Sequence, residues 1–320
     1  MLINILLFIL GLALLGKGAS WLVEGSASLA RKFGIPEFIV GITVVGFGTS
    51  FPEFIVNVIA SIQGQEGDIV IGNVIGSNNF NLLFIIGISG LIAPLAIGPT
   101  TQRKEIPISF AAIVLLLFLA NDDFLFHEKE AVLGRLDGII LLLFFVLFLI
   151  NMLHVVKSDK KKLNLSDQKA NSKRLILTVL LGLFALLLGG KIMVDSAIRI
   201  AQSYHMSKEL IGLTIVSAGT SFPELATSIV AARKGKANLA IGNILGSNIF
   251  NILFILGVSV LIRPVDYSKD FNLDSLIMML ATIFLFISMY TGKKRMVDRW
   301  EALIFLIGSF CYLYYLIQRG

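Results

Sequence analysis

The sequence predicts an all-α integral membrane protein with ten transmembrane helices, arranged as two inverted five-helix repeats. Hydrophobic residues make up 56% of the 320 residues and charged residues only 15%, a balance far outside that of a soluble domain of this length. The chain also contains about ten apolar runs long enough to cross a bilayer. Finally, two long segments of the first half recur in the second half.

Each helix is placed on an apolar run that spans roughly 30 Å of hydrocarbon at about 1.5 Å per residue. The first run has no basic residue before its apolar core and no small-residue cleavage site, so it is expected to be a retained helix rather than a secretory signal. The predicted helices are residues 2–24, 37–62, 69–92, 106–121, 133–156, 173–200, 209–232, 240–263, 273–292 and 299–317.

The distribution of basic residues predicts the topology. The connection KSDKKKLNLSDQKANSKR, residues 157–174, carries seven basic and two acidic residues. The positive-inside rule places such a connection in the cytoplasm, which is favoured over a nucleic-acid-binding patch. Alternation of the helices then puts eighteen Lys and Arg residues on the cytoplasmic side and seven outside. Both termini are therefore predicted to lie outside.

The internal repeat predicts the domain organisation. GITVVGFGTSFPEFIVNVIAS aligns with GLTIVSAGTSFPELATSIVAA, and IGNVIGSNNFNLLFIIGISGLI aligns with IGNILGSNIFNILFILGVSVLI, at offsets of 170 to 171 residues. Five helices are an odd number, so the second repeat must enter the membrane from the opposite side, as in secondary transporters. We assign residues 1–156 to the first repeat, 157–172 to the cytoplasmic basic loop and 173–320 to the second repeat.

Both repeats contain the motif GTSFPE at the centre of a predicted helix. Pro52 has no N–H and clashes with the carbonyl of Gly48, so the helix should kink or open there and free carbonyl oxygens. Thr49 and Ser50 precede Glu53 by four and three residues, which places them on about the same helical face. The corresponding residues of the second repeat are Thr220, Ser221, Pro223 and Glu224.

The helix that follows each motif adds hydroxyl and amide groups. Ser77 with Asn81, and Ser247 with Asn251, have i, i+4 spacing on one face. Oxygen ligands suit hard cations such as calcium and sodium and argue against zinc or copper. The structural alternative is that these groups and the neighbouring glycines only join helices. That does not explain paired glutamates, because a carboxylate at the bilayer centre costs about 2.5 to 3.5 kcal/mol.

Other metal chemistry finds little support in the sequence. His127, His154 and His205 never reach the short spacing of a zinc site, and Cys311 is the one cysteine. An enzyme is not expected, because neither a histidine nor a second acid stands near the hydroxyls to activate a nucleophile. No cofactor is predicted; calcium and sodium are expected as transported ligands.

The paired GTSFPE motifs, followed by GNVIGSNNFN and GNILGSNIFN, resemble the two α-repeats of the cation/calcium antiporter superfamily, in its sodium/calcium exchanger branch. The resemblance covers both repeats. It implies an antiporter that uses sodium influx to extrude calcium, with Glu53 and Glu224 as shared ligands. The further ligands it implies are Thr49, Ser50, Thr220, Ser221, Ser77 and Ser247, with the carbonyls of Gly46 and Ser217; Asn81 and Asn251 complete the predicted site.

One departure bears on the transported ions. Some relatives have an aspartate where this chain has Asn251, and in the potassium-dependent branch that acid is associated with potassium transport. With asparagine at both 81 and 251, the site charge is about −2 and potassium-independent exchange is expected. The usual three-for-one exchange of the family would make transport electrogenic.

Transport is expected to follow alternating access, through a gating movement of helices 2–24 and 173–200. These helices carry Lys17, Glu24, Lys191 and Asp195, and the lysines are expected to snorkel and pair locally with the acids. The alternatives are a proton/calcium or other cation/calcium antiporter, because midplane carboxylates can couple to protons, and a non-transporting membrane scaffold or sensor. The expected location is a prokaryotic cell (inner) membrane, with the lipid bilayer as partner and no nucleic acid.

Overall fold

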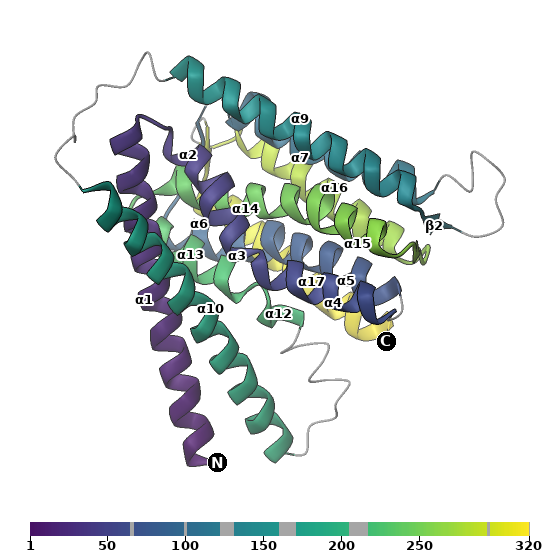
Figure 1. Ribbon diagram of the computed structural model, residues 1–320, viewed down its shortest axis with the longest axis horizontal. Coiled ribbons are helices and arrows are strands. Elements are labelled where there is room, and N and C mark those ends of the chain that lie inside the picture. Colours follow the sequence, from purple (N-terminus) through teal and green to yellow (C-terminus); the bar gives the residue numbers. More distant parts are fainter. Residues whose placement is uncertain are drawn as a thin grey trace.

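The fold is that of a mostly helical membrane protein (Figure 1). The computed structural model describes residues 1–64, 67–98, 101–121, 131–159, 171–204, 217–292 and 295–319. Among these residues, seven helices are long and apolar enough to cross a membrane, and one bent pair forms an eighth span. The all-α membrane class is confirmed. The count of ten stays a prediction, since the predicted helix 106–121 is a short helix of 15 residues that is not among these spans and the predicted helix 209–232 is described only from residue 217 onward.

The first half begins with α1 and continues through a broken helix. Its elements are α1 (Leu2–Phe33), α2 (Glu37–Val40), η1 (Gly41–Val45), α3 (Gly46–Thr49), α4 (Phe51–Gln63), α5 (Gly67–Asn79), η2 (Phe80–Ile85), α6 (Ile86–Ile92), β1 (Leu95–Ala96), η3 (Thr101–Glu105), α7 (Ile106–Ala120), β2 (Val132–Leu133) and α9 (Arg135–Asp159), where η marks a π-helical segment.

The second half follows the same order. Its elements are α10 (Ser172–Ser203), α12 (Ser217–Gly219), α13 (Phe222–Arg233), α14 (Ala237–Ile249), η5 (Phe250–Leu256), α15 (Gly257–Ile262), β3 (Val265–Asp266), α16 (Phe271–Ser288), β4 (Met296–Val297) and α17 (Arg299–Arg319).

Helix α1 is longer than predicted. The apolar run ends near Glu24, but the helix continues to Phe33 and stops at Gly34, which has the left-handed conformation with φ 61° and ψ 38°. Its last turns stay helical because Ala27 and Ala30 remain buried against the core. The limit at residue 24 was wrong because hydropathy measures the hydrocarbon span, whereas a helix continues for as long as packing supports it.

Helices α1 and α10 lie side by side and antiparallel (Figure 1). Glycines bring their backbones together: a Cβ on Gly18 would lie 2.5 Å from the backbone nitrogen of Leu186, and one on Gly11 would lie 2.6 Å from that of Met193. Small residues of this kind allow close helix contact within a membrane. The two helices therefore pack as one pair.

Two short strand pairs indicate which of the connections between helices lie on the same side of the membrane. β1 pairs with β4, and β2 pairs with β3, both antiparallel. Alternation of the helices puts β1 and β4 in connections on one side and β2 and β3 in connections on the other. The pairings agree with this alternation, and the predicted cytoplasmic identity of the first side stays a prediction.

Helix α14 lies at the centre of the molecule. It crosses the broken helix α2–α4 closely, and its residues from Leu239 to Ile249 are all buried. A Cβ on Gly246 would lie 2.6 Å from the Cα of Ile42, and one on Gly242 would lie 2.5 Å from the carbonyl oxygen of Phe38. The crossing thus depends on glycine at these two positions.

We predict that Gly246→Ala destabilises the protein by about 1 to 3 kcal/mol, the usual cost of overpacking a close contact. Gly16→Ala is the matched control, since a Cβ there meets nothing within 4 Å and alanine favours helix. Thermal unfolding of both variants in detergent measures the difference. Equal midpoints for the two variants would contradict the close crossing at Gly246.

Candidate cation-binding site

The GTSFPE motif breaks its helix in both repeats. Ser50 separates α3 from α4 with φ −80° and ψ 7°, and Ser221 separates α12 from α13 with φ −90° and ψ 6°. Both serines have the sparsely populated bridge conformation between the α and β regions. Between the two parts of the first broken helix the axis bends by 46°, so the break predicted from Pro52 is observed.

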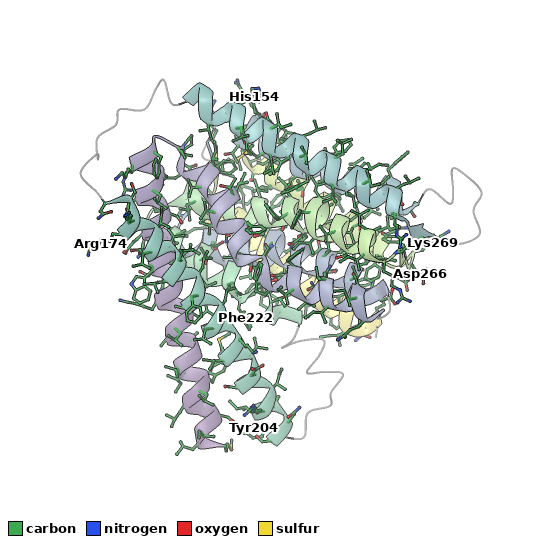
Figure 2. The ribbon with its side chains drawn as sticks, in the orientation of Figure 1. His154, Arg174, Tyr204, Phe222, Asp266 and Lys269 are labelled. Atoms are coloured by element: carbon green, nitrogen blue, oxygen red, sulfur yellow. The ribbon has the colours of Figure 1, made fainter. Side chains whose placement is uncertain are left out.

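Each break places a glutamate at the start of the next helix. Glu53 lies in the first turn of α4, and Glu224 lies in the first turn of α13. The N-terminal end of a helix carries a partial positive charge, which stabilises a carboxylate. Both side chains are buried, with 1% and 0% of their surface exposed. Phe222, at the start of α13, lies near the middle of the molecule (Figure 2).

Serine–glutamate hydrogen bonds cross between the repeats. The Ser50 hydroxyl donates to Oε1 of Glu224 at 2.9 Å, and the Ser221 hydroxyl donates to Oε1 of Glu53 at 3.2 Å. Each carboxylate therefore depends on the opposite repeat. The second oxygen, Oε2, of both glutamates has no hydrogen-bond partner in the described part of the chain. The two motifs thus form one buried site with two carboxylate oxygens available to a ligand.

Four asparagines form a second crossing network beside the glutamates. The Asn81 amide donates to Oδ1 of Asn248 at 3.0 Å, and the Asn251 amide donates to Oδ1 of Asn78 at 2.9 Å. Nδ2 of Asn78 donates to the Asn248 carbonyl at 3.2 Å, and Nδ2 of Asn248 donates to the Asn78 carbonyl at 3.4 Å. With their nitrogens engaged in this way, Asn81 and Asn251 leave Oδ1 without a partner among the described residues. Amide oxygens of this kind suit a hard cation.

Sequence reasoning missed Asn78 and Asn248, although both directly follow the predicted ligands Ser77 and Ser247. It also missed Asn73 and Asn243, whose amides donate to the carbonyls of Glu53 at 3.4 Å and of Glu224 at 3.3 Å. The detectable signal was their recurrence as GN and SN in both repeats. These four residues support the site rather than supply its free oxygens.

The remaining predicted residues differ between the repeats. Thr49 donates to Oδ1 of Asn243 at 3.0 Å and lies 3.2 Å from the Gly46 carbonyl, whereas the buried hydroxyl of Thr220 has no partner in the described residues. Ser247 lies 3.3 Å from the Gly46 carbonyl and 3.4 Å from Oε1 of Glu224. Its counterpart Ser77 has an unpartnered hydroxyl within the same described set.

The two predicted carbonyl ligands also differ. The Gly46 carbonyl accepts from the Ser50 amide at 3.0 Å, and the hydroxyls of Thr49 and Ser247 lie 3.2 and 3.3 Å from it. In the second repeat the Ser221 amide donates to the carbonyl of Ala218, at 3.2 Å, rather than to the carbonyl of Ser217. The side chain of Ser217 lies outside the described residues, as do residues 205–216. A cation at the Gly46 carbonyl would have to compete with the Ser50 amide and the two nearby hydroxyls.

The donor set is made of oxygen atoms. No group of three or more His, Cys, Asp or Glu residues that could hold a metal occurs in the described ranges. His154 lies at the end of α9 (Figure 2), where its Nδ1 is 2.8 Å from the Ile150 carbonyl of its own helix. His127 and His205 lie outside the described residues. Carboxylate, hydroxyl and amide oxygens suit calcium and sodium.

The charges on α1 do not pair as predicted. Glu24 forms an ion pair with Lys234, from the end of α13, and Lys234 also donates to Ser20. Lys17 lies over the ring of Trp21, 5.6 Å from its centre. The expectation of local lysine–acid pairing was therefore wrong for Glu24, because the fold brings a lysine 210 residues away to this end of α1.

Comparison with known proteins identifies the family of this site. The model of the family described as sodium/calcium exchanger protein matches residues 3–153 and 174–318. The chain belongs to this family. Its members are transporters rather than a known class of enzyme, and the resemblance carried by the GTSFPE motifs is confirmed.

Two relatives of this exchanger-family chain match it over nearly their full length. It is 38% identical to the putative antiporter CaxA of Alkalimonas amylolytica, over 99% of this chain and 100% of the relative. It is 31% identical to the sodium/calcium exchanger MaX1 of Methanosarcina acetivorans, over 95% and 96% of the two chains. A solved structure of the sodium-calcium exchanger NCX_Mj, soaked with Na⁺ and Ca²⁺, matches with a TM-score of 0.82 at 28% identity, over 98% of each chain.

We predict that Ser50→Ala and Ser221→Ala each lower calcium affinity about ten-fold, equivalent to about 1.4 kcal/mol. Each removes a hydroxyl from the site and a donor from the buried carboxylate of the opposite repeat. Because both serines belong to one site, the effects in the double variant should not be additive. Isothermal titration of calcium into detergent-solubilised protein measures all three.

The matched control is Ser259→Ala. In the parent chain the Ser259 hydroxyl donates to the Ile255 carbonyl of its own turn, at 2.7 Å. This variant should leave calcium affinity unchanged. The crossed arrangement is refuted if either site serine can be replaced with no more effect than Ser259.

Proposed function

We propose that the protein is a secondary-active antiporter that exchanges sodium for calcium across a membrane. The observation that carries this proposal is the pair of buried glutamates, Glu53 and Glu224, each with one oxygen held by the serine of the opposite repeat and one oxygen without a partner in the described chain. Membership of the exchanger family and the likeness to MaX1 and NCX_Mj support it.

The charge of the site accounts for exchange. Two carboxylates give about −2, which one calcium ion or two sodium ions neutralise. Leaving two buried carboxylates without a cation is costly, because desolvation penalises each charge and the two repel one another. Calcium and sodium therefore compete for the same oxygens. The site changes the side to which it is open at low cost only when a cation occupies it, so the movement of one ion in one direction is coupled to that of the other in the opposite direction.

The ligands implied by the resemblance divide into two groups on this proposal. Calcium is bound by the two glutamates with the oxygens of Asn81 and Asn251. Sodium uses the same glutamates with the surrounding hydroxyls and carbonyls, namely Thr49, Ser50, Thr220, Ser221, Ser77, Ser247, Gly46 and Ser217. Neutral amides at 81 and 251 add no charge for a potassium ion, so we propose potassium-independent exchange. A third sodium ion per calcium would make it electrogenic.

Alternating access completes the proposal. The paired helices α1 and α10 move as a unit past the core, exposing the site to one side and then the other. We further propose two inverted repeats at 1–156 and 173–320, joined by the basic loop 157–172, and a prokaryotic inner-membrane location with both termini outside. Proton/calcium exchange is the second candidate, because two buried carboxyl groups with free oxygens are also suited to binding protons.

We predict that sodium-loaded proteoliposomes take up calcium when external sodium is low, and that Glu53→Gln or Glu224→Gln lowers the rate at least ten-fold. Either change leaves a single carboxylate for a divalent ion. Glu37→Gln is the control, since Glu37 pairs with Lys236 at 2.7 Å, away from the site, and it should retain uptake. Radioactive calcium measures the rate, with sodium, potassium and pH varied separately.

Three outcomes separate the candidates. Uptake that needs sodium, ignores potassium and responds to an imposed membrane potential supports the proposal. Uptake driven by a pH gradient and indifferent to sodium would establish the proton/calcium candidate instead. If neither glutamate variant changes calcium binding or flux, the protein is a scaffold or sensor rather than an antiporter.

A further inference from the structure

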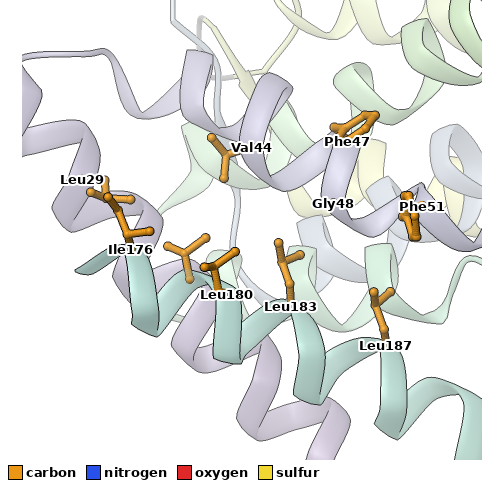
Figure 3. A pocket seen from close by; sticks show the side chains of 10 residues that line it. Leu29, Val44, Phe47, Gly48, Phe51, Ile176, Leu180, Leu183 and Leu187 are labelled. Atoms are coloured by element: carbon orange, nitrogen blue, oxygen red, sulfur yellow. The ribbon is translucent and has the colours of Figure 1, made fainter. Parts of the chain in front are cut away.

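An apolar groove lies between α10 and the broken helix α2–α4 (Figure 3). Its volume is about 500 Å³. Several of its side chains are well exposed, including Leu180 at 56%, Phe51 at 40% and Phe47 at 40%. The lining residues, none of them polar, are Leu29, Val44, Phe47, Gly48, Phe51, Ile176, Val179, Leu180, Leu183 and Leu187.

The groove reaches the back of the cation site. Gly48 and Phe51 line the groove, and the two residues between them in the sequence are Thr49 and Ser50. Leu183 of α10 packs directly on Gly48, where a Cβ would lie 2.5 Å from Cδ2 of the leucine. Whatever fills the groove therefore touches the segment that carries two of the predicted ligands.

Basic residues occur on both helices near one end of the groove. Leu29 and Ile176 lie together at this end (Figure 3). Arg31 follows Leu29 by two residues in α1, and Arg174 precedes Ile176 by two residues in the antiparallel α10. The antiparallel contacts of α1 and α10 continue in step from Gly18 with Leu186 to Gly25 with Val179. Arg31 and Lys32 lie in the last turn of α1, and Lys173 and Arg174 lie in the first turn of α10, so both antiparallel helices carry their basic residues at this end. Figure 2 shows Arg174 at this end of α10 and Tyr204 at the other.

The positive charge of this end is only partly neutralised. Glu37 is paired with both Arg31, at 3.5 Å, and Lys236, at 2.7 Å. Lys173 and Arg174 are exposed and take part in no ion pair in the described part of the chain. An exposed apolar groove thus lies beside exposed cationic side chains.

We propose that the groove binds one acyl chain of an anionic phospholipid, whose phosphate group is held by Lys173 and Arg174 with Arg31 beside them. Lipid tails are as apolar as leucine, so the groove alone gives no preference for one lipid over another. The preference comes from the headgroup, because Lys and Arg near a membrane surface attract anionic lipids. The chain itself fills a gap that would otherwise forfeit dispersion contacts.

The test places a tryptophan in the groove and measures its quenching by lipids with brominated acyl chains. Leu180→Trp is made in a background in which Trp21 and Trp300, the two native tryptophans, are replaced by phenylalanine. At equal mole fractions, brominated phosphatidylglycerol should quench more strongly than brominated phosphatidylcholine. Each basic side chain should contribute roughly five-fold in relative affinity, from about 1 kcal/mol per residue. Ile176→Trp is a second reporter should Leu180→Trp fail to fold.

Two controls isolate the site. Phe118→Trp on α7 has the same exposure in the parent chain, 56%, and should show equal quenching by both lipids. Lys173→Gln with Arg174→Gln should abolish the preference at position 180, whereas Arg103→Gln with Lys104→Gln should not. Equal quenching by both lipids at position 180, or a preference that survives the Lys173 and Arg174 changes, would overturn the proposal. The measurement needs no ion transport, so its result is independent of the proposed exchange.

Discussion

The structure depends on one exchange of hydrogen bonds, in which Ser50 binds Glu224 and Ser221 binds Glu53. A carboxylate in a membrane interior must have polar partners, and a continuous helix offers none from its own backbone. The breaks at the two serines solve this problem, since each creates a helix start for its own glutamate and presents a hydroxyl to the other. Neither repeat forms the site alone. The two halves must therefore pack face to face, and the glycine contacts of α14 with η1 are the means by which they approach.

The asparagines extend the same constraint. Asn78 and Asn248 each donate to the other's carbonyl and accept from the amide of Asn251 or Asn81. Their function is orientation, because a primary amide exposes oxygen on one side only when its nitrogen is engaged on the other. Unlike this symmetric network, the hydroxyls are bonded unequally in the two repeats. Such inequality fits the proposed alternating access, because two halves with identical hydrogen bonds would make both faces of the membrane equivalent.

Much of this arrangement is encoded locally and could be predicted. Proline lacks a donor in any context, so the breaks before Glu53 and Glu224 followed from the sequence. The position of both motifs at the centres of their predicted helices placed them near one depth. The π-helical segments η2 and η5 could not be predicted, because FNLLFI and FNILFIL carry no local signal that separates them from an α-helix. Tertiary packing around Asn81 and Asn251 decides them. The partner of Glu24 was missed for the same reason, since only the fold brings Lys234 to α1.

The neutral side chains at positions 81 and 251 follow from the hydrogen bonds of the site as well as from its composition. An aspartate at position 251 would present an oxygen where the amide of Asn251 now donates to Oδ1 of Asn78. Two acceptors would then face one another, and Asn78 would have to turn its amide to supply a donor. Its Nδ2 already serves the Asn248 carbonyl, so turning it would release that buried acceptor at a cost of about 1 to 3 kcal/mol. Charge at this position is thus coupled to the support on both sides of the site. A chain that gains a third acid here must also rebuild the contact between its two repeats, which is why the asparagines at 78, 81, 248 and 251 act as one unit.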